Sequence, residues 1–183
     1  MSTDSQYDLY RLTGKTDLVS HLRCLVNRRG YRVLYYHRLL NRSRGIIRLF
    51  VRLLNRRLQK KMLIEIPIDL RLGKGALLLH PYAIVINKEA VIGNNFTILK
   101  GATIGSDLTR NIGAPKIGDN VYVGLNSTIV GNVKIGNNVM IAANTFVNFD
   151  VPDDSLVLGS PGVIHLRKTK HGEYTMNSVG PLK

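Results

Sequence analysis

The sequence predicts an all-β solenoid of short strands, preceded by a basic α-helical segment. Three observations lead to this fold class: a six-residue repeat of branched aliphatic residues in the second half, an amphipathic pattern in the first third, and a sharp fall in positive charge between the two. With 183 residues, of which 44% are hydrophobic, the chain is long enough for one sizeable core, or for a core and a small appendage.

The repeat is clearest from Ile117 onward, where the chain divides without gaps into IGDNVY, VGLNST, IVGNVK, IGNNVM, IAANTF and VNFDVP. Every first position is a branched aliphatic residue, and every fifth is small or β-branched. A period of six fits neither a helix nor a hairpin and is typical of a solenoid. We expect each hexapeptide to form a short strand and a turn, with its aliphatic residue in a narrow core, and three strands to make one coil of about eighteen residues.

The repeat continues upstream, with two interruptions. Its first positions there are Ile66, Leu72, Leu78, Ile84, Ile92, Ile98 and Ile104. The spacing is eight between Ile84 and Ile92 and thirteen between Ile104 and Ile117. Surplus residues in a solenoid bulge outward as loops, often on the binding face. The spacing therefore predicts a small expansion after Ile84 and a loop at 105–116.

Residues 17–62 are predicted to be helical and amphipathic. In GIIRLFVRLLNRRLQKK, which starts at Gly45, apolar residues recur three and four apart, and a cationic stripe recurs at strict fours. The stripe consists of Arg48, Arg52, Arg56 and Lys60. The stretches DLVSHLRCLVN and YRVLYYHRLL have similar character and are separated by a break at Gly30. We expect two or three helices that end near Met62, after a flexible N-terminus at 1–16.

The helical segment holds most of the positive charge. Between Asp17 and Lys61 there are thirteen basic residues and one acid, so this segment supplies +12 of the net charge of +14. A basic helix with an apolar face can lie on an anionic membrane, or it can pack on the protein or on a neighbouring subunit with its arginines solvated. Nucleic acid is a third partner class for such charge, but no RNA- or DNA-binding motif accompanies it, so we expect no nucleic-acid partner.

Cysteine content and hydropathy indicate the compartment. Cys24 is the only cysteine, which excludes a disulfide framework and a thiolate metal cluster. No stretch approaches the roughly 18 to 20 apolar residues that a membrane-spanning helix needs, and MSTDSQYDLY lacks the order of a signal peptide. We therefore expect a cytoplasmic protein, with contact at the inner face of the cell membrane as an open alternative.

The stretch LLLHPYAIVIN at 77–87 sets a histidine and a proline into an apolar run. A lone histidine in such a run is more often a core residue than a catalytic one. His80, however, is two residues beyond the core position Leu78, so the coil can turn it outward. Zinc needs three clustered ligands, and His80 is the only histidine within the repeats and away from their ends, so no metal site is expected.

The repeat region resembles hexapeptide-repeat acyltransferases. From IEIPIDLRLGKGALLLHPYAIVIN to VPDDSLVLGSPGVI it is most similar to serine acetyltransferases and their relatives in polysaccharide gene clusters, with the eight-residue step after the histidine strand, TIG before a loop that ends in PKIGDN, and a closing GSPG turn. This resemblance implies a left-handed parallel β-helix catalytic domain at 63–165, with the loop at 105–116, and a C-terminal tail at 166–183. It also implies a homotrimer with active sites between subunits.

The resemblance implies that His80 is the catalytic base and that acetyl-CoA is the donor. A carboxylate fifteen residues earlier orients the base in this family, and here that residue is Glu65, where the family norm is aspartate. An imidazole can take the proton of a hydroxyl as it attacks the thioester and pass it to the departing CoA thiolate. Backbone N–H groups near Gly105 are candidates to stabilise the oxyanion.

The resemblance also places the cofactor. It brings the pantetheine arm close to the backbone at Gly105, Ser106, Leu125 and Ala143, although Leu125 stands where the family usually has alanine. In the tail, Arg167 and Lys168 are candidates to bind the CoA phosphates.

The acceptor is predicted from departures from the serine-specific pattern. Serine acetyltransferases have an aspartate directly before the catalytic histidine and an Arg-His pair before Pro-Lys, whereas this chain has Leu79 and the pair Gly113 and Ala114. A site that binds serine, a zwitterion, needs a carboxylate to pair with the ammonium group and a cation to pair with the carboxylate. We therefore expect a sugar hydroxyl of a cell-surface or capsular polysaccharide precursor, free or lipid-linked, with Asp107 and Asn111 as polar binding groups. The alternatives are a serine O-acetyltransferase of cysteine biosynthesis and a non-catalytic β-helix scaffold.

Overall fold

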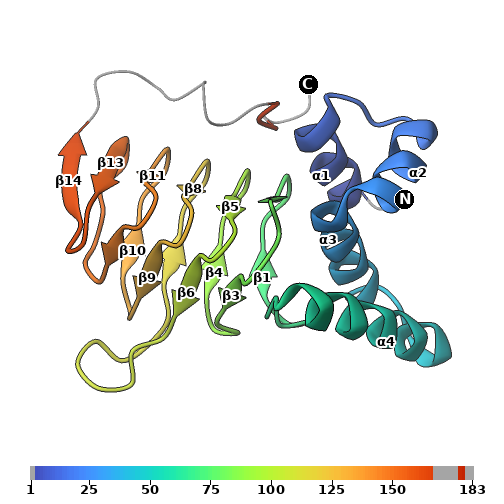
Figure 1. Ribbon diagram of the computed structural model, residues 1–183, viewed down its shortest axis with the longest axis horizontal. Helices are drawn as coiled ribbons and strands as arrows, with labels where there is room; N and C mark the ends of the chain where they lie inside the picture. The colour runs from blue at the N-terminus through green and yellow to red at the C-terminus, as the bar shows by residue number, and fades with distance from the viewer. Residues whose placement is uncertain (1–2, 167–176, 180–183) are drawn as a thin grey trace.

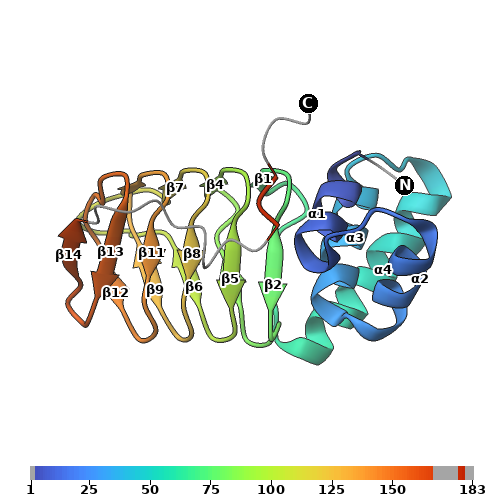
Figure 2. The same cartoon turned by 90° about the horizontal axis from the view of Figure 1, so that it is seen from above.

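The computed structural model describes residues 3–166 and 177–179, in which four helices precede a coil of short strands (Figure 1). The helices are α1 (Thr3–Thr13), α2 (Leu18–Asn27), α3 (Arg29–Leu40) and α4 (Gly45–Met62). Seen from above, they gather at one end of the coil (Figure 2). The last helix ends at Met62, where the sequence predicts the end of the helical segment.

The strands form three sheets in which each of the first twelve strands pairs with the strand three places away in the chain. The first sheet contains β1 (Arg71–Leu72), β4 (Val91–Ile92), β7 (Lys116–Ile117) and β10 (Lys134–Ile135). The second contains β2 (Leu77–Leu79), β5 (Thr97–Leu99), β8 (Tyr122–Val123), β11 (Met140–Ile141), β13 (Ser155–Leu158) and β14 (Val163–Leu166). The third contains β3 (Val85–Ile86), β6 (Thr103–Gly105), β9 (Thr128–Val130) and β12 (Phe146–Val147). Beyond β12, β13 pairs with β11, and β14 with β13. All pairs are parallel except β13 with β14, so the chain winds as a coil with three strands per turn.

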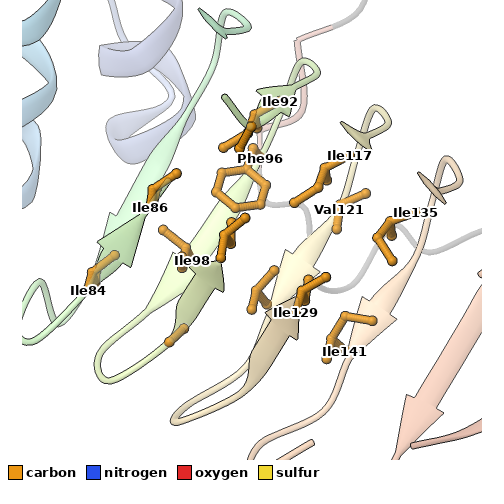
Figure 3. Close-up of a cluster of buried hydrophobic side chains, with 14 of the residues drawn as sticks. Ile84, Ile86, Ile92, Phe96, Ile98, Ile117, Val121, Ile129, Ile135 and Ile141 are labelled. Atoms are coloured by element: carbon orange, nitrogen blue, oxygen red, sulfur yellow. The ribbon is translucent and has the colours of Figure 1, made fainter. Parts of the chain in front are cut away.

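The core is a set of stacked aliphatic columns along the inside of this coil (Figure 3). In the second sheet, Ile98 pairs with Val123, and Val123 pairs with Ile141. These three side chains are at most 1% exposed. Because full burial of an aliphatic side chain stabilises a fold by about 1.5–3 kcal/mol, each turn of the coil contributes through its own inward residues. The six-residue repeat therefore encodes the core directly.

One corner of the coil carries a ladder of amide side chains. The Nδ2 atom of Asn95 donates to Oδ1 of Asn120 at 2.9 Å, and Asn120 donates in the same way to Asn138 at 3.1 Å. Asn138 then donates to Oδ1 of Asp154 at 3.1 Å. All four residues have a positive φ of 55–58°, a conformation that asparagine and aspartate tolerate better than other side-chain-bearing residues. The ladder thus stabilises both the turn and the stacking of successive turns.

The first helix corrects the prediction of a flexible N-terminus at 1–16. Within α1, Arg11 is fully buried and donates to the carbonyls of Gly75 and Asn95 at 3.0 and 3.2 Å, and to Oγ1 of Thr97 at 2.8 Å. Burial lowers its pKa to about 10. The sequence hides this role, because an isolated arginine in a short polar stretch normally remains in solvent.

A buried ion pair holds α1 to α3 and to the coil. Asp8 lies 3.0 Å from Nε of Arg38 and accepts a hydrogen bond from the Ala76 N–H at 2.8 Å. Arg38 also donates to the carbonyls of Leu72 and Gly73. Burial raises the pKa of Asp8, although the Arg38 guanidinium acts in the opposite direction. Charged side chains from two helices therefore satisfy backbone groups at the open end of the first turn.

Candidate functional site

His80 lies in an enlarged corner between β2 and β3. The backbone N–H of Gly101 donates to the carbonyl of Tyr82 at 2.9 Å, so Tyr82 occupies the position of Lys100 in the next turn. Leu79 pairs with Leu99. Two residues, His80 and Pro81, therefore have no counterpart in the next turn, and they form an outward bulge.

This register corrects the predicted place of the two surplus residues. The Val85 N–H donates to the Ala102 carbonyl, and Ile86 pairs with Ile104, so Ile86 and not Ile84 is the first position of its hexapeptide. Ile84 and Ile86 are 0% and 4% exposed. Because both are buried, hydrophobicity cannot separate the two frames. A proline, which cannot donate to a sheet, is the sequence signal that would have placed the bulge at Pro81.

The backbone is left-handed at His80 in the bulge and again at Ala83, the regular corner position, where Gly101, Asn126 and Asn144 of later turns are left-handed too. His80 has a φ of 49° and Ala83 a φ of 51°. Non-glycine residues pay about 1–2 kcal/mol for this conformation, and such strained positions concentrate at functional sites. The His80 and Tyr82 side chains are exposed. The corner therefore presents an imidazole outward from a rigid coil.

Glu65 lies in the first turn but does not contact His80. Its N–H donates to the Ile84 carbonyl at 2.8 Å, and its own carbonyl accepts from the Ile86 N–H at 2.9 Å, which extends the third sheet by one isolated bridge. The Glu65 residue is exposed. Among the described residues, no hydrogen bond joins Glu65 to His80. The structure thus brings the two residues to the same end of the coil, but their side chains are not paired.

A cavity of about 380 Å³, here called the His80 cavity, lies where α3 begins beside the end of β2. It is lined by residues 27–30 and 79–81, with an apolar wall that includes Leu12 and Leu34. Gly30 makes this approach possible, because a Cβ atom there would lie 2.3 Å from the carbonyl oxygen of Leu78. The predicted helix break at Gly30 is misplaced by two residues: α2 ends at Asn27, and α3, which begins at Arg29, contains Gly30.

Glu65 lines a second cavity of about 380 Å³, between α4 and the start of the third sheet. Arg52, Arg56 and Lys60 from the cationic stripe line this second cavity, together with Asn55, which is 2% exposed. His80 and Glu65 therefore face two different hollows of the single chain.

The residues predicted to contact the cofactor lie at two edges of the third sheet. Leu125 and Ala143 stack in the same corner as His80, where the Leu125 carbonyl accepts from the Asn144 N–H at 2.7 Å. Gly105 and Ser106 lie at the opposite edge, where β6 ends. The four residues flank the outward face of β6, β9 and β12 and do not form one cluster. Arg167 and Lys168 lie outside the described residues.

The loop at 105–116 is organised by Asp107. Its carboxylate accepts hydrogen bonds from the N–H groups of Thr109, Arg110 and Asn111 at 2.8, 3.3 and 3.1 Å, and from the Thr109 hydroxyl at 2.9 Å. The Thr109 and Asn111 N–H groups contribute most to holding the pKa of Asp107 at about 2. Asp107 thus has a structural role that its sequence position did not reveal.

The loop also carries two exposed apolar side chains that no sequence motif marks. Leu108 is 82% exposed and Ile112 is 69% exposed, so the loop carries apolar side chains into solvent. The described residues contain no group of three histidine, cysteine or acidic side chains arranged to hold a metal.

Comparison with known proteins identifies similar sequences. Residues 114–148 match the family model "Bacterial transferase hexapeptide (six repeats)". The chain is 34% identical over 148 residues to serine acetyltransferase 1, chloroplastic, of Arabidopsis thaliana, a match that covers 78% of this chain and 46% of that protein. It is 41% identical over 104 residues to the putative colanic acid biosynthesis acetyltransferase WcaB of Escherichia coli (strain K12), covering 57% and 64% respectively. The chain thus spans about half the length of the plant relative.

Two solved structures are similar over most of the chain. The serine acetyltransferase of Neisseria gonorrhoeae has a TM-score of 0.76 and 32% sequence identity, over 92% of this chain and 67% of that one. The serine acetyltransferase of Brucella abortus in complex with coenzyme A has a TM-score of 0.75 and 26% identity, over 91% and 68%. Both matches extend beyond the repeat region, because coverage above 90% requires the helices as well as the coil.

Proposed function

Because the chain belongs to the family of bacterial hexapeptide-repeat transferases, we propose that it is an acetyl-CoA-dependent O-acetyltransferase acting on a sugar hydroxyl of a cell-surface polysaccharide precursor. The observation that carries this proposal is the bulge at His80, which directs an imidazole outward beside a cavity large enough for a sugar. A regular corner of this coil needs neither the two surplus residues nor a second left-handed residue at His80. We therefore propose that this corner is the catalytic site.

In the proposed mechanism, His80 is the general base. Its neutral imidazole accepts the proton of the acceptor hydroxyl while the hydroxyl oxygen attacks the thioester carbonyl of acetyl-CoA. When the tetrahedral intermediate collapses, the carbon–sulfur bond breaks and the imidazolium returns the proton to the CoA thiolate. The products are the acetyl ester and CoA, and no covalent enzyme intermediate forms.

Glu65 is proposed to orient His80 and to stabilise its imidazolium, as a carboxylate does in a catalytic triad. Its place on the outward face of the first turn supports this role, since both residues lie at the same end of the coil. The pair would have to close on binding or on assembly, because the two side chains line separate cavities in the single chain. A homotrimer, with a left-handed coil in each subunit, is part of the proposal.

The donor is proposed to lie along the outward face of the third sheet. A Cβ atom at Gly105 would have Cγ2 of Val130 as its nearest neighbour, at 3.6 Å, so there is space beside this backbone. Ala143 is exposed and small, although Leu125 is bulkier. The solved relative with bound coenzyme A supports this donor. Arg167 and Lys168 would bind its phosphates from the tail.

A saccharide acceptor is favoured over serine by the side chains near His80. Leu79 lines the His80 cavity and offers no carboxylate to an ammonium group. The similarity to a putative colanic acid acetyltransferase also favours a sugar. Serine O-acetylation is the second candidate function, because relatives named serine acetyltransferase match a larger share of this chain. Asn111 remains a proposed contact to the sugar.

Parallel assays with the two acceptors separate these two functions. The enzyme is incubated with acetyl-CoA and either L-serine or the unacetylated polysaccharide repeat unit, and CoA release is followed. The proposal predicts saccharide-dependent release with little on serine. Efficient O-acetylserine formation, with a kcat/KM near the 10⁴ M⁻¹s⁻¹ or more that is common for enzymes on their own substrates, would instead assign the second function.

The proposed location is the cytoplasm, with α4 against the inner face of the membrane when the acceptor is lipid-linked. On α4, Ile46, Phe50 and Leu53 are 83%, 63% and 57% exposed, and the cationic stripe lies beside them. An anionic bilayer could accept both kinds of side chain. None of the helices in the described part of the chain is long and apolar enough to cross a membrane.

A further inference from the structure

We propose that the His80 cavity binds the acceptor and selects a saccharide that carries a carboxylate or phosphate group. This inference rests on the proposed function and adds the charge class of its substrate. Its basis is the set of side chains that the α2–α3 junction places around the cavity, which the repeat region alone would not reveal.

The cavity is positioned to hold the acceptor because it begins at the candidate base. His80 and Pro81 form one side of it, and the first turn of α3 forms the other. The contact between Gly30 and the Leu78 carbonyl fixes the helix against the strand two residues before His80. A ligand in the cavity therefore lies next to the imidazole, as an acceptor hydroxyl must.

The charge around the cavity is positive. Arg28 and Arg29 line it from the junction of α2 and α3. Among the described lining residues, Asp8 is the one acid, and it is 1% exposed and bound to Arg38. The two arginines therefore have no acid beside them in the cavity, and a guanidinium binds carboxylate and phosphate oxygens through charge-assisted, bidentate hydrogen bonds.

The backbone adds to this preference. α3 begins at this cavity, and its N-cap residue, Arg28, provides no side-chain hydrogen bond to the first turn. The backbone N–H groups of Arg29 and Gly30 have no acceptor among the described residues. These free N–H donors favour an anion at the same place as the arginines, although the C-terminus of α2, which ends at Asn27 in the same junction, opposes the dipole of α3.

The rest of the wall suits a sugar ring. Leu12, Leu34 and Leu79 give the cavity an apolar side, and Asn27 adds an amide at its rim. A pyranose has apolar C–H faces and hydroxyl edges, so it can place a face on the leucines and its acidic substituent on the arginines. A free ammonium group would face two arginines here, and the one lining carboxylate, Asp8, is already paired with Arg38.

The test compares a neutral glucose derivative with two anionic ones, which carry a carboxylate at C6 or a phosphate at C1. Acetyl transfer by the full-length enzyme is measured as kcat/KM with methyl glucuronide, methyl glucoside and glucose 1-phosphate, in parallel with the unacetylated repeat unit. The wild-type enzyme is expected to favour at least one anionic acceptor over the neutral glucoside by on the order of 10- to 100-fold. The carboxylate and phosphate arms show which anion the cavity takes.

Matched variants locate the preference. Arg28→Gln/Arg29→Gln should remove most of it, mainly through a higher KM for the anionic acceptor. Arg23→Gln/Arg44→Gln removes the same charge from two exposed arginines that do not line the cavity, and it should retain the preference.

The outcomes separate this inference from the proposed function. Transfer to neutral and anionic saccharides with equal efficiency, or a preference that survives in Arg28→Gln/Arg29→Gln, overturns the charge selection and leaves the acetyltransferase intact. Absence of transfer to every saccharide, with transfer to L-serine, overturns the proposed function and this inference with it.

Discussion

The carbonyl oxygen of Tyr82 accepts a hydrogen bond from the Gly101 N–H at 2.9 Å, and this pairing leaves His80 and Pro81 without counterparts in the next turn. The rest of the corner keeps the register of a regular turn, so the bulge is an addition to the coil and does not replace any ladder hydrogen bond. A substitution at His80 should therefore leave the ladder hydrogen bonds of the coil intact.

Arg11 should be a major determinant of stability. Arg11→Met removes the donors to the Gly75 and Asn95 carbonyls and leaves them buried, which costs about 1–3 kcal/mol for each unsatisfied group. We expect the free energy of unfolding to fall by about 3 kcal/mol in urea titrations. Arg23→Met, at an exposed arginine, is the control and should change it by less than about 0.5 kcal/mol. Equal stability of the two variants would contradict the capping role of α1.

His37 should make the protein less stable in mild acid. Burial, and secondarily Arg38, lower the pKa of His37 from 6.5 to about 4. Between these values the unfolded chain binds a proton that the folded chain does not, so this contribution is complete above pH 6.5 and is lost as the pH falls towards 4. From pH 7.5 to pH 5 the loss is about 2 kcal/mol.

The measurement is the free energy of unfolding in urea at pH 7.5 and pH 5, for the wild type and for His37→Gln. The variant lacks the titrating ring and should show a smaller difference between the two pH values. A wild-type difference that the variant reproduces in full would place the acid sensitivity elsewhere.

Membrane contact should depend on the exposed apolar residues of α4. Ile46→Ser/Phe50→Ser/Leu53→Ser should abolish co-sedimentation of the full-length protein with anionic liposomes at low salt, because apolar insertion and charge act together. Added salt should weaken wild-type binding, since each Lys or Arg near the surface contributes about 1 kcal/mol by attraction that salt screens.

The control for this experiment is Leu108→Ser/Ile112→Ser, which removes exposed apolar side chains from the loop at 105–116. It should sediment like the wild type. If the α4 variant also sediments like the wild type, membrane binding through the apolar face of α4 is contradicted. Substitution is a cleaner test than deletion of residues 1–62, because deletion would also remove Arg11 and Arg38 from the end of the coil.

The sequence predicts the fold correctly where a single residue in each repeat is both aliphatic and buried. From Ile117 to Val147 each sixth residue is aliphatic and each is buried, so period and core coincide. The sequence does not show whether Ile84 or Ile86 is the first position of its hexapeptide, because both are buried. Only the hydrogen-bond register identifies Ile86. In physical terms, periodicity reports which side chains are inside but not where a turn gains two residues.

The candidate site was predictable only in part, because its cavities depend on contacts between distant segments. His80 was identified from its place within the repeat and from resemblance. Gly30 contacts Leu78, and Arg11 contacts Thr97, but no sequence repeat or motif links the residues of either pair. Asp107 reads as an exposed acid, and only the folded loop brings three N–H groups to its carboxylate.

The role of His80 is the central claim, and His80→Asn tests it most directly. Asparagine tolerates the left-handed conformation at this position, so the bulge should be retained, but its amide cannot accept the hydroxyl proton. We expect the thermal midpoint to stay within about 2 °C of the wild type, as for an exposed substitution. The rate of CoA release with acetyl-CoA and the saccharide acceptor should fall by a factor on the order of 10² to 10⁴, as expected when a general base is removed. A folded His80→Asn protein that retains wild-type turnover would contradict the assignment of this corner to catalysis.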